Sequence, residues 1–440
     1  RSSLDWYGSE VMSERKTIPR GGRARGSLLE EMQDLRCDDA RYREGRTWSL
    51  VYYVDPSHHD FLEQAHNTFF AENALNPMAF KSLKRMESEV VQMTASMLAG
   101  PDSCVGTMTS GGTESLLMVV KSMRDRARRR RPWIRRPNMV VPRTVHAAFD
   151  KAAHYFGVKV RYVEVGPDFR ADVRAMERAI DRNTILLVGS APQYPHGVVD
   201  PIAQLGALAQ RKKLPLHVDA CFGGFMLPWL EKLGHPVPTW DFRVPGVTSV
   251  SADVHKYGYA AKGASVLLYR DMSYLRHQFF VSTDWPGGIY ASPSMPGTRP
   301  GGPIAAAWAA MQVMGEEGYT ALAEQALETT RKLRAGIDAI PELRVLGDFH
   351  CTSVTWASQG DAVNVYAVAD LMAEKSWSCD RQQRPPSIHL TVNANNADVA
   401  DQYLADLAES TARAAREPQL ADEGEAAMYG MMAKVPLRGL

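Results

Sequence analysis

The sequence predicts an α/β protein built on a mostly parallel, seven-stranded sheet. Between Cys104 and Tyr269 it holds seven short apolar runs, and helical or loop segments alternate with most of them. This alternation is typical of parallel sheets with helices on both faces. The runs lie near residues 104–108, 138–142, 158–165, 184–190, 214–219, 247–251 and 265–269. Ligands of such sheets bind at the carboxyl ends of strands, and there the chemically distinctive residues fall.

The length of 440 residues predicts two or three domains. We expect an N-terminal segment over residues 1–75 and a large α/β domain over 76–303. A smaller C-terminal α+β domain over 304–440 would begin with a long helix from Ile304. Residues 1–11 precede a plausible natural start at Met12, and we assign them no function.

Composition excludes several classes of protein. The 45% hydrophobic and 23% charged content is that of an ordinary globular protein, and a net charge of +1 gives no general case for binding nucleic acid or membranes. No apolar run approaches the roughly 20 residues that span a bilayer, so we expect no transmembrane anchor. Five cysteines without a C-x-x-C pair favour the reducing cytoplasm and no metal site.

One basic cluster stands out after the first apolar run. It consists of Arg124, Arg126, Arg128, Arg129, Arg130, Arg131, Arg135 and Arg136. Such a cluster can bind nucleic acid or anionic lipid. It is also typical of a solvated helix C-terminus, where cations complement the helix dipole. We favour the second interpretation and expect no nucleic-acid partner.

The stretch SADVHKYGYAAKG (251–263) carries the strongest chemical signal. Lys256 follows a β-branched apolar run and is preceded by His255. A lysine at the end of a buried strand is constrained and partly desolvated, so we expect its amine to lose a proton more easily than a surface lysine's. Such an amine suits a Schiff base with pyridoxal phosphate. The alternative is an ordinary loop lysine beside a structural histidine.

A glycine turn follows the first apolar run and opens an amphipathic helix. Gly111, Gly112 and Thr113 form it. Backbone N–H groups and the helix dipole at such a turn attract an anion, so the turn predicts a phosphate site. It is neither a G-x-G-x-x-G nor a Walker loop, which disfavours NAD and ATP. By itself, a Gly-Gly turn is more often structural.

Other strand ends carry groups that a flat, aromatic cofactor requires. His146 can stack on a ring, although a lone histidine is more often a hydrogen-bonded loop residue. Asp219 can pair with a protonated pyridine nitrogen and so keep the ring an electron sink. A buried aspartate without such a partner would be costly. Together with Lys256 and the glycine turn, these residues predict a pyridoxal phosphate site.

These stretches resemble the sphingosine-1-phosphate lyases, which are group II decarboxylase-like enzymes of fold type I. The matching motifs are TSGGTES (109–115), HAAFDKA (146–152), PQYPHGVVDP (192–201), PLHVDACFGGF (215–225), GVTSVSADVHKYGYAAKG (246–263), TDWPGGIYASP (283–293), GTRPGG (297–302), PPSIH (385–389) and MYGM (428–431). The likeness runs from about residue 26 to about residue 433. It implies a bacterial form without the eukaryotic membrane anchor.

The resemblance assigns the cofactor contacts. Lys256 would hold pyridoxal 5'-phosphate as a Schiff base, Asp219 would pair with its ring nitrogen and His146 would stack on the ring. The residues implied for the cofactor phosphate are Gly112, Thr113, His255 and Thr298. The last of these would reach in from the second subunit of a homodimer.

The resemblance also implies a second phosphate site, for the substrate. Its residues would be Tyr52, Asn73, Asn76 and Lys262. The family's N-P-L-H stretch reads Asn73-Ala74-Leu75-Asn76 here, so asparagine replaces the family histidine. Asn76 can donate a hydrogen bond but carries no charge. Tyr194 and Tyr429 match family tyrosines near the reacting centre.

The implied reaction is retro-aldol cleavage of sphingosine 1-phosphate, or its dihydro form, to a long-chain fatty aldehyde and phosphoethanolamine. The alternative is an amino-acid decarboxylase of the same superfamily, since the aspartate, histidine and lysine are shared. Tyr52 and Lys262 favour the lyase, because a simple amino acid needs no second phosphate site.

Overall fold

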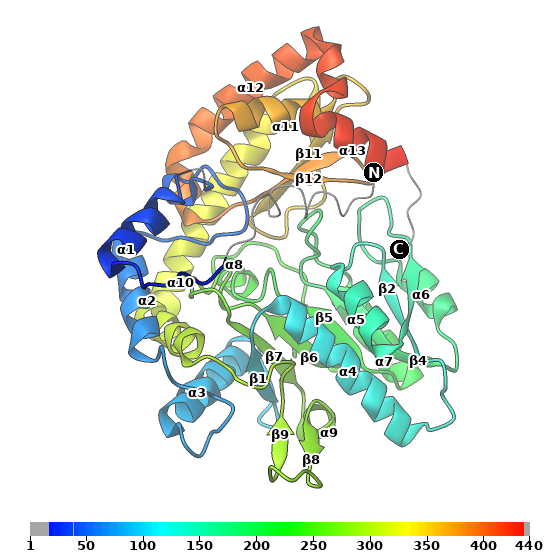
Figure 1. Cartoon of the computed structure of the whole chain (residues 1–440). Coiled ribbons are helices and arrows are strands. Elements are labelled where there is room, and N and C mark those ends of the chain that lie inside the picture. Colours follow the sequence, from blue (N-terminus) through cyan, green and yellow to red (C-terminus); the bar gives the residue numbers. More distant parts are fainter. Residues whose placement is uncertain (1–16, 38, 435–440) are drawn as a thin grey trace. The chain divides into compact units, whose positions relative to one another are not determined.

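The computed structural model describes residues 17–37 and 39–434 (Figure 1). The chain divides into two compact units, residues 1–40 and 41–440. The first contains helix α1 (Arg25–Asp34). Residues 1–11 and the proposed start at Met12 lie outside the described part of the chain.

A seven-stranded sheet forms the centre of the second unit. Its strands are β1 (Val105–Thr109), β2 (Asn138–Pro142), β3 (Lys159–Val163), β4 (Thr184–Ser190), β5 (Leu216–Asp219), β6 (Val247–Ala252) and β7 (Ser265–Tyr269). They are ordered β1-β7-β6-β5-β4-β2-β3, and β7 runs antiparallel to both of its neighbours. The sheet confirms the predicted fold class, because each strand coincides with one of the seven apolar runs.

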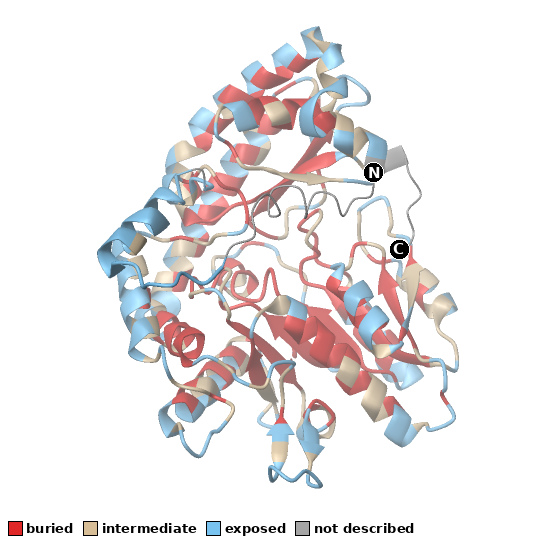
Figure 2. Ribbon diagram, in the orientation of Figure 1, coloured by how far each residue is buried: buried red, intermediate tan, exposed pale blue. Residues whose placement is uncertain are grey.

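The apolar runs form strands because both faces of the sheet are covered. Every residue of β2, β4, β5, β6 and β7 is buried, as expected for a parallel sheet between helical layers (Figure 2). Helices α4 and α5 cover one face, and α3, α7 and α8 pack with the core of the other. The helices of this part are α2 (Pro56–Thr68), α3 (Lys81–Met97), α4 (Gly112–Arg130), α5 (Ala148–Phe156), α6 (Val173–Ala179), α7 (Ile202–Lys212), α8 (Leu227–Lys232) and α9 (Met272–Leu275).

A smaller antiparallel sheet belongs to the C-terminal α+β part, as predicted. Its order is β10 (Leu343–Leu346), β11 (Ser353–Ser358), β13 (Ser387–Thr391) and β12 (Asp380–Gln382). The long helix α10 (Gly301–Asp338) precedes it and is broken at Gly315, where φ is 54°. The predicted domain boundaries near residues 75 and 303 stay predictions.

The remaining elements are hairpin β8 (Phe280–Ser282) and β9 (Tyr290–Ser292), helices α11 (Val365–Glu374), α12 (Ala400–Arg416) and α13 (Gly424–Lys434), and short 3₁₀ helices at Tyr42–Glu44, Ala394–Val399 and Pro418–Asp422.

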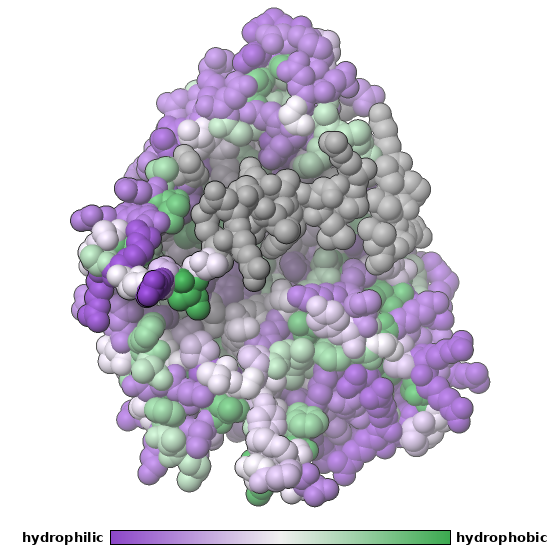
Figure 3. Space-filling view, viewed as in Figure 1, coloured by the Kyte–Doolittle hydropathy of each residue, from purple (hydrophilic) through white to green (hydrophobic). Residues whose placement is uncertain are grey.

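The arginine cluster lies at the C-terminal end of α4, where hydrophilic residues dominate the surface at the lower right of Figure 3. Arg131 donates to the backbone carbonyl of Thr184 at 3.0 Å, and Arg126 lies over the ring of Tyr274. The other arginines of the helix end, Arg128, Arg129 and Arg130, are exposed, which fits the interpretation of a solvated helix end. Among the described helices, none is long and apolar enough to cross a membrane.

Candidate active site

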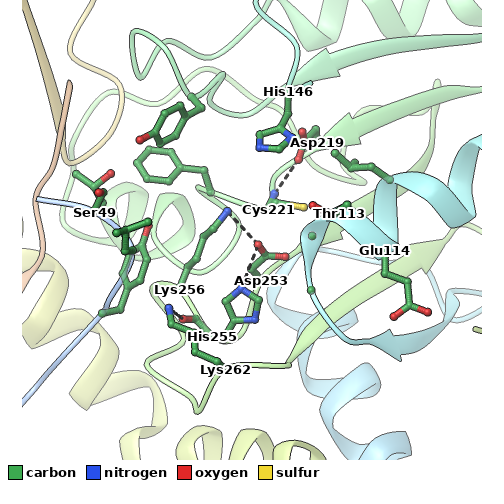
Figure 4. Close-up of a pocket in the computed structure, with 18 of the residues that line it drawn as sticks. Ser49, Thr113, Glu114, His146, Asp219, Cys221, Asp253, His255, Lys256 and Lys262 are labelled. Atoms are coloured by element: carbon green, nitrogen blue, oxygen red, sulfur yellow. Dashed lines mark hydrogen bonds and ion pairs between the residues drawn. The ribbon is translucent and has the colours of Figure 1, made fainter. Parts of the chain in front are cut away.

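A cavity of about 540 Å³ lies at the carboxyl ends of the parallel strands and reaches the C-terminal sheet (Figure 4). It brings together many of the predicted site residues. Those that line it are Tyr52, Gly112, Thr113, His146, Tyr194, Asp219, His255, Lys256 and Lys262. These residues span more than 200 positions of the chain, so the fold assembles them from separate strand ends.

Lys256 lies in the turn after β6, and its amine faces a carboxylate that the sequence analysis did not weigh. Its Nζ is 3.0 Å from Oδ2 of Asp253, whose side chain is 2% exposed. Burial by itself would lower the pKa of Lys256, but the Asp253 carboxylate outweighs it and raises that pKa. The expectation of an easily deprotonated amine is therefore wrong for this arrangement. Asp253 therefore favours the charged form of the Lys256 amine.

Asp253 also reaches the neighbouring histidine. Nε2 of His255 is 3.6 Å from Oδ2 of Asp253, and Nδ1 of His255 accepts a hydrogen bond from the backbone N–H of Ala264 at 3.1 Å. Burial lowers the pKa of His255 to about 4, so the imidazole is neutral at physiological pH. Burial alone would raise the pKa of Asp253, yet the Lys256 charge lowers it below its usual range.

The glycine turn before α4 leaves no room for side chains. Gly111 has φ 156°, a conformation that favours glycine. A Cβ on Gly112 would lie 2.8 Å from Oδ2 of Asp253 and 2.9 Å from Sγ of Cys221. The first turn of a helix has N–H groups without intrahelical partners, and here those of α4 begin at the cavity wall. The turn therefore offers backbone donors to an anion.

Glu114 fixes this turn from within α4. Its buried carboxylate accepts hydrogen bonds from N–H and Oγ of Ser110, each at 2.7 Å. It also accepts from the N–H of Met295 at 2.7 Å. Glu114 thus joins the turn to the loop that leads to Thr298.

His146 and Asp219 lie close together above Lys256 in Figure 4. Nδ1 of His146 accepts the N–H of Ala148 at 3.1 Å. Asp219, at the end of β5 and 7% exposed, accepts from the N–H of Cys221 at 3.1 Å and from Oγ of Ser251 at 3.4 Å. No basic side chain of the described residues pairs with it, so a buried carboxylate faces the cavity and can receive a protonated nitrogen.

These features fit pyridoxal phosphate. Gly111, Gly112 and Thr113 line the cavity at the N-terminus of α4, where a phosphate group is favoured. Oδ1 of Asp253 is buried and has no hydrogen-bond partner in the described part of the chain. Asp219 matches a pyridinium nitrogen, and Lys256 supplies the amine that such cofactors require.

A second cationic group lies in the same cavity. Nζ of Lys262 is 5.3 Å from the ring centroid of Tyr52 and 3.3 Å from the carbonyl oxygen of His255. Although the side chain reaches solvent, desolvation by the cavity wall, together with the charge of Lys256, lowers the pKa of Lys262 to about 8. Lys262 is therefore available to an additional anion.

The C-terminal sheet supplies a further carboxylate that the sequence analysis missed. The hydroxyl of Tyr194 donates to Oδ2 of Asp380, and Oγ of Ser49 donates to Oδ1 of Asp380 at 3.0 Å. All three side chains line the cavity. No sequence signal joins them, because Ser49 and Asp380 are 331 positions apart. Asp253 differs, since it stands in the same motif as Lys256 and could have been found.

Four predicted site residues do not line this cavity in the described part of the chain. Nδ2 of Asn73 donates weakly to Oγ1 of Thr298 at 3.4 Å. Oδ1 of Asn76 accepts hydrogen bonds from the N–H groups of Met78 and Ala79, which stabilise the turn in which Asn76 lies. Tyr429, on α13, packs against Tyr366 with ring centroids 5.2 Å apart. Their predicted roles stay predictions.

Comparison with known proteins identifies the class that this fold and site define. The pyridoxal-dependent decarboxylase conserved domain matches residues 58–358. Sphingosine-1-phosphate lyase 1 of Rattus norvegicus is 45% identical over 420 residues, which are 94% of this chain and 73% of the rat protein. The structure of a sphingosine-1-phosphate lyase from Burkholderia pseudomallei aligns with a TM-score of 0.88 at 40% identity, covering 98% of this chain and 99% of that one. The protein is thus a pyridoxal-dependent enzyme of fold type I. Within that class, the chain belongs to the sphingosine-1-phosphate lyase family.

Proposed function

We propose that this enzyme cleaves sphingosine 1-phosphate, or its dihydro form, by a retro-aldol reaction that yields a long-chain fatty aldehyde and phosphoethanolamine. The observation that carries the proposal is Lys262 beside Tyr52, in the same cavity as Lys256 and the glycine turn. The cavity therefore offers cationic or N–H groups for two phosphates, one of the cofactor and one of the substrate. The 45% identity of the chain to the rat sphingosine-1-phosphate lyase supports this reaction over amino-acid decarboxylation.

The cofactor would supply the electron sink for carbon–carbon cleavage. Lys256 would anchor it and give way to the substrate amine, while Asp219 would keep the ring nitrogen protonated. Gly112, Thr113 and His255 would hold its phosphate. Lys262 and Tyr52 would grip the substrate phosphate, so that binding energy remote from the reacting bond orients that bond.

The test is an assay of the purified, cofactor-loaded protein. Sphingosine 1-phosphate should release a long-chain aldehyde and phosphoethanolamine in equal amounts, whereas sphingosine without phosphate should be a much poorer substrate. Glutamate and aromatic amino acids, assayed for carbon dioxide, serve as controls for decarboxylation. Carbon dioxide release without aldehyde release would contradict the proposal.

We also propose that the enzyme is a homodimer in the cytoplasm, with Thr298, Asn73 and Asn76 completing the site of the partner subunit. In support, these residues lie apart from the Lys256 cavity of their own chain. Large apolar side chains are also exposed near Thr298, on and beside the β8–β9 hairpin, namely Phe280, Val281, Trp285 and Ile289. The described cysteines are all free, which fits a reducing compartment.

Subunit mixing tests the shared site. Lys256→Ala and the double variant Asn73→Ala/Thr298→Ala should each be weakly active or inactive. Mixing them under conditions of subunit exchange should restore activity, because one site then has both Lys256 and an intact partner contribution. A mixture of Lys256→Ala with Lys262→Ala is the matched control and should show no activity beyond that of Lys262→Ala alone, because both residues belong to the same subunit's cavity. A particle mass of one chain, or no rescue despite exchange, would contradict the shared site.

A further inference from the structure

Tyr194 and Asp380 make a contact between the loop after β4 and the C-terminal sheet at the cavity wall. Tyr194 lies in the loop after β4, and Asp380 begins β12 of the C-terminal sheet. The half-buried Tyr194 ring is held by His389, with centroids 4.3 Å apart, and by Phe222 at 5.9 Å. The position of the phenol oxygen is therefore fixed by packing as well as by Asp380.

The hydrogen bonds of this contact determine which atom donates a proton and which accepts it. A tyrosine hydroxyl has one proton, and Tyr194 donates that proton to Oδ2 of Asp380. Ser49, whose side chain is buried, donates to the other carboxylate oxygen and so prevents the carboxylate from turning. Tyr194 has no other hydrogen-bond partner among the described residues. Tyr194 lines the cavity, and its hydroxyl oxygen retains the capacity to accept a hydrogen bond there.

Tyr194 stays a neutral phenol in this setting. Burial, and then the negative charge of Asp380, raise the pKa of Tyr194 well above its usual range. The group facing the cavity is thus a hydrogen-bond acceptor whose only proton is already used. A substrate hydroxyl that donates a hydrogen bond complements it, and a group that only accepts does not.

We propose that Asp380 is a positioning residue that makes Tyr194 a dedicated acceptor for the 3-hydroxyl group of the substrate. The inference rests on the proposed function, since retro-aldol cleavage requires a hydroxyl at this carbon and the departure of its proton. Holding that hydroxyl by its proton orients the O–H bond before cleavage. Asp380 acts through Tyr194, and Ser49 acts through Asp380.

The test is a double-mutant cycle on the cofactor-loaded protein. Its substrate is sphinganine 1-phosphate, the dihydro form of sphingosine 1-phosphate. Asp380→Leu and Tyr194→Phe should each lower kcat/KM by about three- to tenfold or more, the range of one hydrogen bond to an uncharged group. Asp380→Leu in the Tyr194→Phe background should cost less than about twofold more, because both changes remove one interaction. Asp380→Asn keeps an oxygen acceptor and should stay within about threefold of the parent.

A second readout separates positioning from general damage. The 3-deoxy analogue of sphinganine 1-phosphate lacks the hydroxyl, so its inhibition constant should be unchanged in all four variants. If a substitution misfolded or displaced the cavity wall, the inhibition constant of the analogue would rise as activity is lost. Cofactor content, followed by visible absorption, should also be unchanged.

The outcomes distinguish this inference from the function on which it rests. A parent protein that does not cleave sphinganine 1-phosphate or sphingosine 1-phosphate overturns both. A parent that cleaves them, with Asp380→Leu fully active, with Asp380→Asn as impaired as Asp380→Leu, or with additive losses in the double variant, overturns the role of Asp380 alone.

Discussion

Asp253 and Lys256, three residues apart in the turn after β6, form an ion pair of 3.0 Å in the cavity wall. Asp253 is almost fully buried, and its second carboxylate oxygen has no hydrogen-bond partner in the described residues. Lys256 is therefore its principal counter-charge. Lys256, which we propose as the cofactor anchor, also pairs with a buried carboxylate, so substitutions at this position should have two separable effects.

Substituting Lys256 should separate anchoring from charge balance. Lys256→Ala and Lys256→Arg should both lose the visible absorption band of the Schiff base between protein and cofactor, and all turnover, because neither supplies a primary amine. Lys256→Ala should also lower the free energy of unfolding by about 1–3 kcal/mol, since a buried carboxylate loses its partner. Lys256→Arg retains a cation and should lose less. Absorption spectra and urea unfolding give the two readouts, and retention of the visible band in either variant would disprove the anchor assignment.

Gly112 should be intolerant of any side chain. Gly112→Ala places a methyl group 2.8 Å from Asp253 Oδ2 and 2.9 Å from Cys221 Sγ, so either the turn or the carboxylate must move. We expect weaker binding of pyridoxal phosphate, measured by spectral titration of the apoprotein. The matched control is Gly318→Ala, whose Cβ meets only Met314 atoms at 3.4 Å or more and which lies inside α10. Equal cofactor affinity in the two variants would mean that the turn is not the phosphate site.

Lys262 should give substrate binding a characteristic pH dependence. Its pKa lies near 8 instead of 10.5, so the amine is charged below about pH 8 and loses its charge as pH rises through that value. A bound phosphate favours the charged form, so KM should rise above pH 8. Lys262→Ala should lower kcat/KM by roughly ten- to hundredfold, the cost of one hydrogen bond to a charged group. Lys262→Arg keeps its charge and should flatten the profile between pH 8 and 10. Unchanged kinetics in Lys262→Ala would exclude Lys262 as a phosphate ligand.

The strand-end residues could be predicted from sequence because each follows a recognisable apolar run. Lys256, Asp219 and the glycine turn all lie at carboxyl ends of parallel strands, where α/β sheets place ligands. The charge state of Lys256 could not be judged in the same way. It depends on how deeply Asp253 is buried, and burial is a tertiary property.

The contacts of the segment around Ser49 with the C-terminal sheet had no local signal in the sequence. The segment before Ser49 is held against the C-terminal sheet by backbone hydrogen bonds, from Trp48 to Ser378 at 3.1 Å and from Thr391 to Trp48 at 2.6 Å. These pairings bring Ser49 to Asp380, across more than 300 positions. No periodicity or motif within either segment specifies the other, so only the assembled fold could reveal the contact.

Asn76 stands where the family has a histidine, and the structure gives its side chain a local role. Its Oδ1 accepts the N–H of Met78 at 3.1 Å and of Ala79 at 3.2 Å, which stabilises the turn before α3. A histidine would have to give up this pair of contacts to the turn. The question is whether Asn76 also donates to the substrate phosphate, as the family's histidine position suggests.

Two substitutions distinguish a turn residue from a phosphate donor. Asp is as good a turn acceptor as Asn, so Asn76→Asp should keep the melting temperature near that of the parent. If Asn76 donates a hydrogen bond to the substrate phosphate, the Asn76→Asp variant should raise KM for sphingosine 1-phosphate by tenfold or more. The aspartate carboxylate would repel the phosphate that the asparagine amide had bound. Asn76→His should then increase kcat/KM, most clearly at mildly acidic pH, where a histidine with a pKa of about 6.5 gains charge. Steady-state kinetics across pH, with melting curves and cofactor content as controls, give the answer. If Asn76→Asp cleaves the substrate as well as the parent does and Asn76→His loses only stability, the asparagine serves the turn and the substrate phosphate depends on Lys262 and Tyr52.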